Sequence, residues 1–246
     1  MKNFIKALLQ KLLGFHTYLY LFSLYIIKTL KRNKNEGDFI YFRDIIPDGG
    51  VILDIGANIG VMTVHLARSH KNSRVYAFEP IPHNIKTLER VIRHYKLNNV
   101  EVIKTALGNS IGEIEMVMPV QKSARLQGLS HVIHDSITEL NEGEKFTTQL
   151  TTLDTFIKQH QITSKISAIK LDVENFEFYV LDGGRETIAA NRPIVYCELW
   201  ENDNRDKCFA LMQEFGYEIK VLQSEKLCKF EPEIHKTQNF FFVPAS

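Results

Sequence analysis

Residues 51–60 read VILDIGANIG, and this stretch decides the fold of the chain. Its first half, 51–55, is a short apolar run that predicts a buried parallel strand. Gly56 and Gly60 then permit a tight turn into a helix that is expected over 59–68. Strand, glycine turn and helix in this order open a doubly wound α/β fold, in which a nucleotide lies over the turn.

The same alternation continues along the chain. The expected strands are 74–79, 100–106, 166–173 and 193–199, and the expected helices are 83–95, 176–190 and 203–215. Such alternation implies parallel strands joined by right-handed crossovers. The segments 217–222 and 239–243 are expected to close the sheet as an antiparallel ribbon. Residues 107–150 interrupt the pattern with polar residues, which predicts a hairpin near Gly112 and a substrate-facing loop or disordered flap.

Composition excludes several classes of protein. The chain has 246 residues, of which 44% are hydrophobic and 24% charged, as in ordinary soluble globular proteins rather than disordered or multi-span membrane proteins. A net charge of +1 gives no general electrostatic case for binding nucleic acid. Three cysteines lie far apart without a CxxC motif, which favours a reducing, cytoplasmic compartment over a disulfide framework or a structural zinc site.

The first 35 residues differ from the rest. They contain seven basic and no acidic residues, leaving 23 basic against 29 acidic residues, a net charge of −6, for 36–246. Apolar residues at helical spacing over 4–13 predict an amphipathic helix, and the apolar stretch 12–27 is shorter than the roughly 20 residues of a membrane span. Three interpretations of 1–35 remain open: a helical lid packed on the domain 36–246, a peripheral membrane attachment, or a transmembrane anchor.

The glycine turn also indicates the class of ligand. It fits neither G-x-G-x-x-G nor the lysine-containing phosphate loop, so it suits a ligand that has a ribose but no pyrophosphate. Glu79 ends the second expected strand, 19 residues after Gly60. A carboxylate at that position is placed to accept hydrogen bonds from both ribose hydroxyls.

Six motifs together resemble those of one enzyme family, the FkbM family of class I S-adenosylmethionine-dependent methyltransferases. They follow the family pattern in order over about residues 40–245: LDIGANIG at 53–60, YAFEP at 76–80, TALG at 105–108, TLD at 152–154, IKLDVENFEFYVL at 169–181 and RPIVYCEL at 192–199. One departure is Asn175, where the family pattern usually has glycine.

The resemblance implies a fold and an activity. The fold is a doubly wound, mostly parallel seven-stranded sheet with an antiparallel last strand, here preceded by an N-terminal helical segment. The activity is O-methylation of a hydroxyl on a sugar, glycan or other small-molecule natural product. S-adenosylmethionine is the implied cofactor. Its methionine part would lie near Asp54, Gly56, Asn58 and Gly60, and its ribose at Glu79 with Pro80 beside it. The end of the third strand, at Ala106 and Leu107 with Asn109 beyond, would flank its adenine.

Charged residues near the ends of the fourth and fifth expected strands are the catalytic candidates. An alcohol is a weak nucleophile that needs a base or a metal ion. Lys170, Asp172 and Glu174 close the fourth strand and Glu198 the fifth, so they converge on the acceptor side. Asp172 is expected to touch the acceptor or the amine of the donor, and Glu174 and Glu198 are candidate bases. The alternative bases are histidines, at positions 83, 131 and 134.

Other possibilities stay open at this stage. Carboxylates would suit Mg²⁺ or Mn²⁺, although no metal ligand set is predicted. A nicotinamide-dependent oxidoreductase and a non-catalytic nucleotide-binding module are the alternative functions. The expected partner is a small-molecule or glycan acceptor rather than nucleic acid, with possible membrane contact through 1–35. The sequence does not indicate an oligomeric state.

Overall fold

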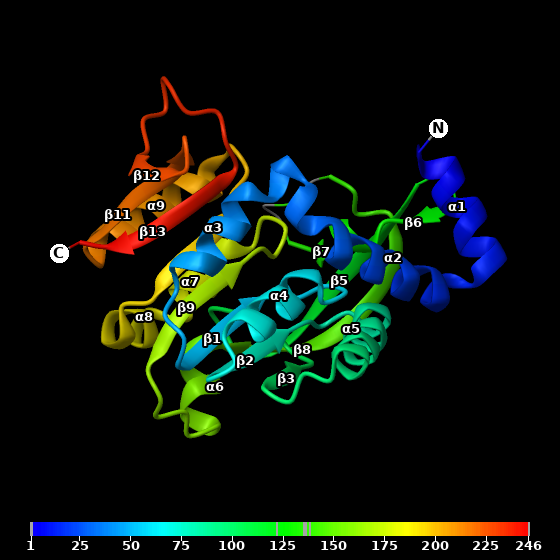
Figure 1. Ribbon diagram of the computed structural model, residues 1–246, viewed down its shortest axis with the longest axis horizontal. Helices are drawn as coiled ribbons and strands as arrows, with labels where there is room; N and C mark the ends of the chain where they lie inside the picture. The colour runs from blue at the N-terminus through cyan, green and yellow to red at the C-terminus, as the bar shows by residue number, and fades with distance from the viewer. Residues whose placement is uncertain (1, 122, 135–136, 138, 246) are drawn as a thin grey trace.

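The computed structural model describes residues 2–121, 123–134, 137 and 139–245. A main sheet of eight strands in the order β12-β11-β13-β10-β9-β1-β2-β3 runs through it (Figure 1). Its parallel strands are β1 (Gly50–Ile55), β2 (Ser73–Phe78), β3 (Val100–Ile103), β9 (Ile166–Leu171) and β10 (Ile194–Glu198). This confirms the doubly wound α/β fold.

The closing ribbon is also confirmed. Strand β13 (Asn239–Pro244) lies antiparallel between β10 and β11 (Tyr217–Gln223). The sheet has one strand more than the expected seven, because β12 (Lys226–Lys229) forms an antiparallel hairpin with β11.

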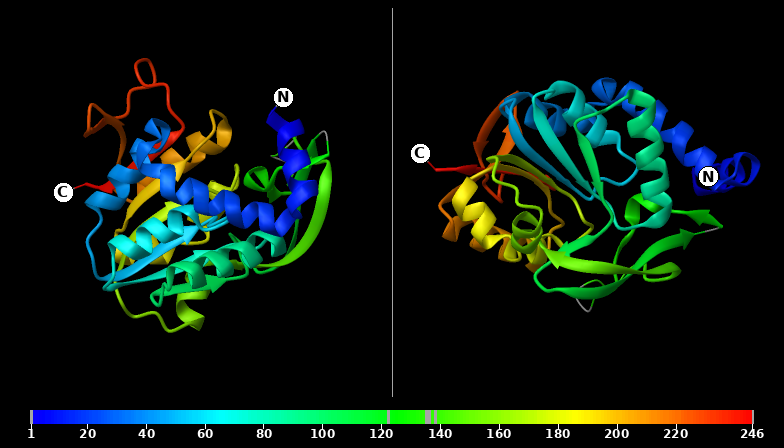
Figure 2. Two further views of the ribbon diagram at one scale, coloured as in Figure 1. Left: turned by 45° about the vertical axis from the view of Figure 1, so that its right-hand side comes forward. Right: turned by 90° about the horizontal axis from the view of Figure 1, so that it is seen from below.

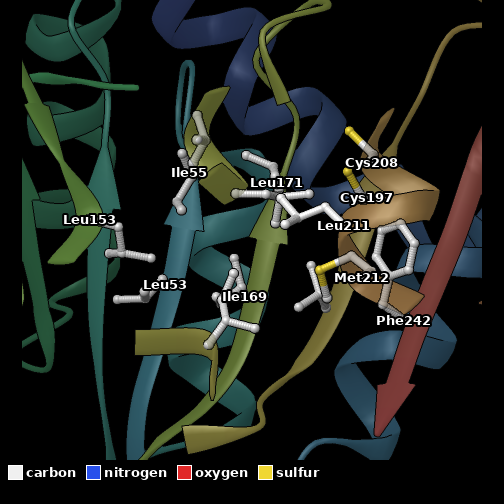
Figure 3. Packing of buried hydrophobic residues seen from close by; sticks show 14 of the residues in the cluster. Leu53, Ile55, Leu153, Ile169, Leu171, Cys197, Cys208, Leu211, Met212 and Phe242 are labelled. Carbon is white, nitrogen blue, oxygen red and sulfur yellow. The ribbon is translucent and has the colours of Figure 1, made fainter. Parts of the chain in front are cut away.

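Helices cover both faces of the main sheet (Figures 1 and 2). One layer contains α3 (Gly37–Ile45), α4 (Val61–Ser69) and α5 (Pro82–Tyr95), and the other contains α6 (Leu153–Gln159), α7 (Glu177–Asp182), α8 (Arg185–Asn191) and α9 (Asp203–Glu214). Alternate residues of each strand serve the two layers. Leu53 and Ile55 join Leu153 and Leu211 on the α6–α9 side (Figure 3), whereas Ile52 packs among residues of α3 and α4.

Two expectations about the middle of the chain are wrong in detail. The third strand ends at Ile103, and 106–108 belong to a second sheet of β4 (Ala106–Gly108), β5 (Gly112–Gln121), β6 (Ala124–Arg125), β7 (His131–Val132) and β8 (Gly143–Thr152). About half of the segment 107–150 is therefore strand rather than loop. Alternate residues of β8 are exposed, and an antiparallel sheet with one face in water tolerates the polar composition that resembled a loop.

The helix expected over 176–190 is two helices. It breaks at Gly183 and Gly184, where the chain passes against β4. A Cβ atom at Gly183 would overlap the backbone carbonyl of Gly108, so the two segments approach more closely than any other residue allows. This contact holds the second sheet against α7, next to the candidate site.

The N-terminal segment forms α1 (Lys2–Leu13) and α2 (Phe15–Thr29), separated at Gly14, and then the short turns η1 (Leu30–Arg32) and η2 (Lys34–Glu36). Helix α2 packs on the domain. Its Ile27, for example, is buried with Val64 of α4 and Val91 of α5. Within the described part of the chain, no helix is long and apolar enough to cross a membrane.

Candidate active site

A pocket lies where β1, β2 and β9 end, because parallel strands bring their carboxyl ends to one edge of the sheet. Register pairs Ile55 with both Phe78 and Leu171, so the three strands end level with one another. The walls of the pocket come from the strand ends, from β4 and α5, and from 127–132 of the second sheet, including Gly56, Asn58, Glu79, Pro80, Asn84, Ala106, Leu107, Gln127, Asp172 and Glu174.

The glycine turn is built for close approach. Gly56 has φ +80°, and a Cβ atom there would overlap the backbone carbonyl of Asp172. Its N–H donates to the Phe78 carbonyl at 3.1 Å, which ties the turn to β2. Gly60 also has positive φ and faces Leu88 of α5, where a side chain would collide. Both glycines are therefore required by the backbone, and they fix the turn beside the end of β9.

Glu79 organises the floor of the pocket. Its carboxylate accepts hydrogen bonds from the backbone N–H of Asn58 at 2.8 Å, from that of Ile81 at 2.8 Å and from Nδ2 of Asn84 at 3.3 Å. Burial raises the pKa of Glu79 to about 7, against the lowering effect of these bonds. A carboxylate has about four acceptor positions, so Oε2, which accepts one of these bonds, can take a ligand hydroxyl as well.

Three amide side chains on the pocket lining have buried oxygens that are unsatisfied. Oδ1 of Asn58, Oδ1 of Asn84 and Oε1 of Gln127 have no hydrogen-bond partner among the described residues. A buried acceptor without a partner is costly, so each of these oxygens is available to accept a hydrogen bond from a donor group on a ligand. Ribose hydroxyls, an ammonium and an adenine amine are such donors. The pocket therefore fits S-adenosylmethionine chemically.

Lys170 connects the turn to the catalytic candidates. It is 2% exposed, and its Nζ donates to the Gly56 carbonyl at 3.0 Å and to Oδ2 of Asp172 at 3.2 Å. Asp54, which is fully buried, lies 3.8 Å from the same nitrogen. Burial would lower the pKa of Lys170, but Asp172 and Asp54 raise it above its usual value. Lys170 is therefore a cation that fixes Asp172 at the pocket edge.

The remaining acids crowd around Asp172. Burial, with Asp172 and Glu198 nearby, raises the pKa of Glu174 to about 9. Burial and Asp172 raise the pKa of Glu198 to about 7. Glu174 lines both this pocket and a neighbouring cavity walled by Leu129, His131 and Trp200. Asp172 likewise borders a polar cavity that holds Glu198 and Glu36. Both acids therefore stand between the donor pocket and space for an acceptor.

Asn175, which stands where the family pattern usually has glycine, adopts the backbone conformation that the turn requires. It has φ 73°, a left-handed conformation that asparagine tolerates better than most residues. Its side-chain oxygen accepts from Nδ2 of Asn202 at 2.9 Å, and its carbonyl accepts from Nδ2 of Asn204 at 2.7 Å. The substitution therefore keeps the turn and attaches it to the N-terminus of α9.

The structure does not gather every predicted residue on the lining. Asp54 lies behind the turn, where Oδ2 accepts from Oγ1 of Thr63 at 2.6 Å. Gly60 is directed at α5, and Asn109 donates to Asp182 at 3.1 Å on the surface. Direct cofactor contact by these three stays a prediction. Sequence reasoning missed Asn84, Gln127 and Glu36. An amide in a helix or a polar segment carries no distinctive signal.

A pH dependence of stability follows from these acids. Glu177, 2% exposed, accepts from the N–H groups of Val173 and Asn175, and burial raises its pKa to about 8. The folded state then holds a proton that the unfolded chain releases above the ordinary pKa of 4.5. Stability should therefore fall as pH rises from about 5 to about 8, lowering the Tm of the ligand-free protein by about 5 °C or more.

Glu177→Gln, which keeps an acceptor oxygen, should flatten this decline in Tm, measured by thermal unfolding at each pH. The exposed Glu233→Gln is the control and should leave the slope unchanged. Equal slopes for Glu177→Gln and the unsubstituted chain would contradict the assignment of a buried proton to Glu177.

The sequence that forms this site matches a known protein family. The sequence profile described as the methyltransferase FkbM domain matches residues 54–219, from the glycine turn into β11. The chain belongs to the FkbM family of S-adenosylmethionine-dependent methyltransferases.

Several relatives are similar to this FkbM protein. Methyltransferase sdnD of Sordaria araneosa is 26% identical over an alignment of 222 residues, which covers 76% of this chain and 84% of sdnD. AMB antimetabolite synthetase AmbE of Pseudomonas aeruginosa is 25% identical over an alignment of 228 residues, which covers 77% of this chain but 10% of AmbE. The crystal structure of Methyltransferase FkbM from Methylobacillus flagellatus KT has a TM-score of 0.53 at 18% identity, covering 80% of this chain and 44% of that one, and shows a shared fold.

Four side chains of this FkbM protein are placed to bind the cofactor. Glu79 and the amides of Asn58, Asn84 and Gln127 would hold the cofactor, whose sulfonium supplies an activated methyl group. Among the described residues, no group of three or more histidine, cysteine, aspartate or glutamate side chains could hold a metal ion.

Proposed function

We propose that this FkbM protein transfers a methyl group to a hydroxyl oxygen of a small molecule or sugar. The observation that carries the proposal is the position of Glu174, which lines both the donor pocket and the cavity beside Trp200. Apolar side chains of Leu129, Ile137 and Leu140 wall that cavity together with Trp200. Its polar lining residues are His131, Glu139, Glu174, Asn175 and Asn202. Apolar and aromatic walls can bind the carbon skeleton of a small organic ligand, while the polar groups can bind its hydroxyls.

The chain's residues would divide the work as follows. Lys170 holds Asp172 at the edge of the donor pocket, where its carboxylate would stabilise positive charge on a bound donor. Glu174 would accept the hydroxyl proton of the acceptor as the acceptor oxygen bonds to the methyl carbon. The bond from that carbon to the sulfonium would break, and its electron pair would stay on the departing neutral sulfur. A positive charge on the donor side lowers the pKa of a nearby carboxylic acid. Donor binding therefore favours the ionised Glu174 that proton abstraction requires.

Charge also supports a small acceptor over nucleic acid. Residues 36–246 carry a net charge of −6, and the acceptor side holds Asp172, Glu174 and Glu198. A phosphate backbone would be repelled by such a surface. A neutral hydroxyl compound meets no such barrier.

Calorimetric titration tests the donor. S-adenosylmethionine should bind, and Glu79→Gln should weaken binding by about ten- to a hundredfold, because an amide nitrogen replaces an acceptor that faces N–H donors. Glu101→Gln, on the exposed edge strand β3, is the control and should bind normally. Binding of NAD without S-adenosylmethionine would instead support a nicotinamide-dependent oxidoreductase.

Incubation with methyl-labelled donor and a panel of sugars, glycans and polyketide alcohols tests the reaction. Mass spectrometry should find label on oxygen in one acceptor class. Label on nitrogen or carbon would contradict O-methylation. Donor binding without any labelled product across hydroxyl, amine and carbon acceptors would support a non-catalytic module.

A further inference from the structure

We infer that α1 docks the protein on an anionic lipid surface. The first observation is the way in which α1 is attached to the domain. Gln10 is 8% exposed, its Nε2 donates to the backbone carbonyl of Arg125 at 3.1 Å, and its Oε1 accepts from the backbone N–H of Arg125 at 3.1 Å. The side-chain amide thus pairs with β6 as a neighbouring strand would. A polar residue, rather than an apolar one, holds α1 in place.

The apolar side of α1 is consequently exposed. The exposed fractions are 69% for Phe4, 51% for Ile5, 47% for Leu8, 40% for Leu9, 71% for Leu12 and 43% for Leu13. At 3.6 residues per turn these six side chains occupy one continuous half of the helix, opposite Ala7 and Gln10. Surface helices normally turn this half toward the core. An apolar face directed outward indicates a protein or membrane contact.

Charge identifies the occupant as an anionic bilayer. Lys6 and Lys11 lie at the two margins of the apolar half, and residues 1–35 contain no acidic residue. Basic residues beside an exposed apolar face are typical of helices that lie in the plane of an anionic membrane. A two-fold pair of copies would bring these lysines toward one another, which opposes self-association through this face.

The position of α1 suits such docking. It is 12 residues long, too short to span a bilayer, and it lies at the periphery of the molecule beside the second sheet (Figures 1 and 2). Phe4 and Leu8, at one margin of the apolar half, border a groove between α1 and the second sheet. The other four apolar side chains of α1 lie outside that groove, so they can enter a lipid headgroup layer without disturbing the fold.

Vesicle flotation of the full chain tests the inference. The protein should float with phosphatidylglycerol-containing vesicles, with at least tenfold weaker association with pure phosphatidylcholine, and salt should reduce binding. The double variant Ile5→Glu/Leu12→Glu should lose binding at least tenfold. The control Ile111→Glu/Ile234→Glu, which changes two similarly exposed side chains outside α1, should bind normally.

Three results would overturn the inference. The first is the absence of binding to anionic vesicles, and the second is equal binding by the Ile5→Glu/Leu12→Glu variant and the unsubstituted protein. The third is a dimer in solution that this variant dissociates, because it would show that a second copy of the chain covers the apolar face. Thermal unfolding should be the same for both double variants, because all four side chains are exposed.

The lysines of α1 are tested by Lys6→Gln/Lys11→Gln, which should weaken binding to anionic vesicles and leave binding to phosphatidylcholine unchanged. Equal effects on the two kinds of vesicle would contradict an electrostatic contribution.

Discussion

Replacing Lys170 with methionine is expected to lower the free energy of unfolding by about 3–5 kcal/mol, the typical result of leaving buried charge unpaired. The lysine is 2% exposed, and fully buried Asp54 lies 3.8 Å from its Nζ. Methionine fills similar space but supplies no charge and no donor for Asp172 or the Gly56 carbonyl. Chemical denaturation with urea measures the difference.

The matched control is Lys104→Met. Lys104 pairs with Glu89 at 2.7 Å, but its side chain is 59% exposed, so its removal should change stability by about 1 kcal/mol or less. A similarly small effect at Lys170 would show that Asp54 is protonated in the folded state and would contradict the ion pair.

Glu174→Gln is expected to reduce turnover by about a hundred- to ten-thousandfold, the usual contribution of a general base. The amide has nearly the same size but cannot accept the acceptor's proton. Donor affinity should change little, because the proposed cofactor contacts are made by Glu79 and the three amides. Turnover is measured on the acceptor found in the labelling panel, and donor affinity by calorimetry.

Glu201→Gln provides the control. Its side chain is 75% exposed beside Trp200, so its turnover should match that of the unsubstituted chain. Unchanged turnover in Glu174→Gln would indicate that Glu198 or His131 is the general base instead. The equivalent substitution at Glu198 would distinguish these two.

The fold was predictable because it depends on local patterns repeated along the chain. VILDIGANIG placed β1, the turn and α4, and the apolar runs placed the other parallel strands. Parallel strands necessarily bring their ends together, so Gly56, Glu79, Asp172 and Glu174 were correctly expected at one edge. The second sheet escaped prediction because one of its faces is exposed and polar.

Site residues that depend on contacts between distant segments could not be predicted from the sequence. Asn84 and Gln127 enter the pocket through the packing of α5 and of the second sheet, which no spacing in the sequence encodes. The absence of a side chain at Gly183, where α7 ends, is required by the carbonyl of Gly108, which lies 75 residues earlier in the chain. Asp54 precedes the turn as expected. However, side chains alternate between the two faces of β1, so Asp54 lies on the α4 side and contacts Thr63 rather than lining the pocket.

The bond between Gln10 and Arg125 has a consequence for solubility. Strand β6 ends one side of the second sheet, and the amide of Gln10 occupies the backbone groups that another polypeptide would otherwise recruit. Uncovered sheet edges promote aggregation, and proteins commonly block them with a helix or loop. Removal of α1 would therefore expose the edge strand β6 to other polypeptide chains. The shortened chain is expected to aggregate even though its Rossmann-like core is intact.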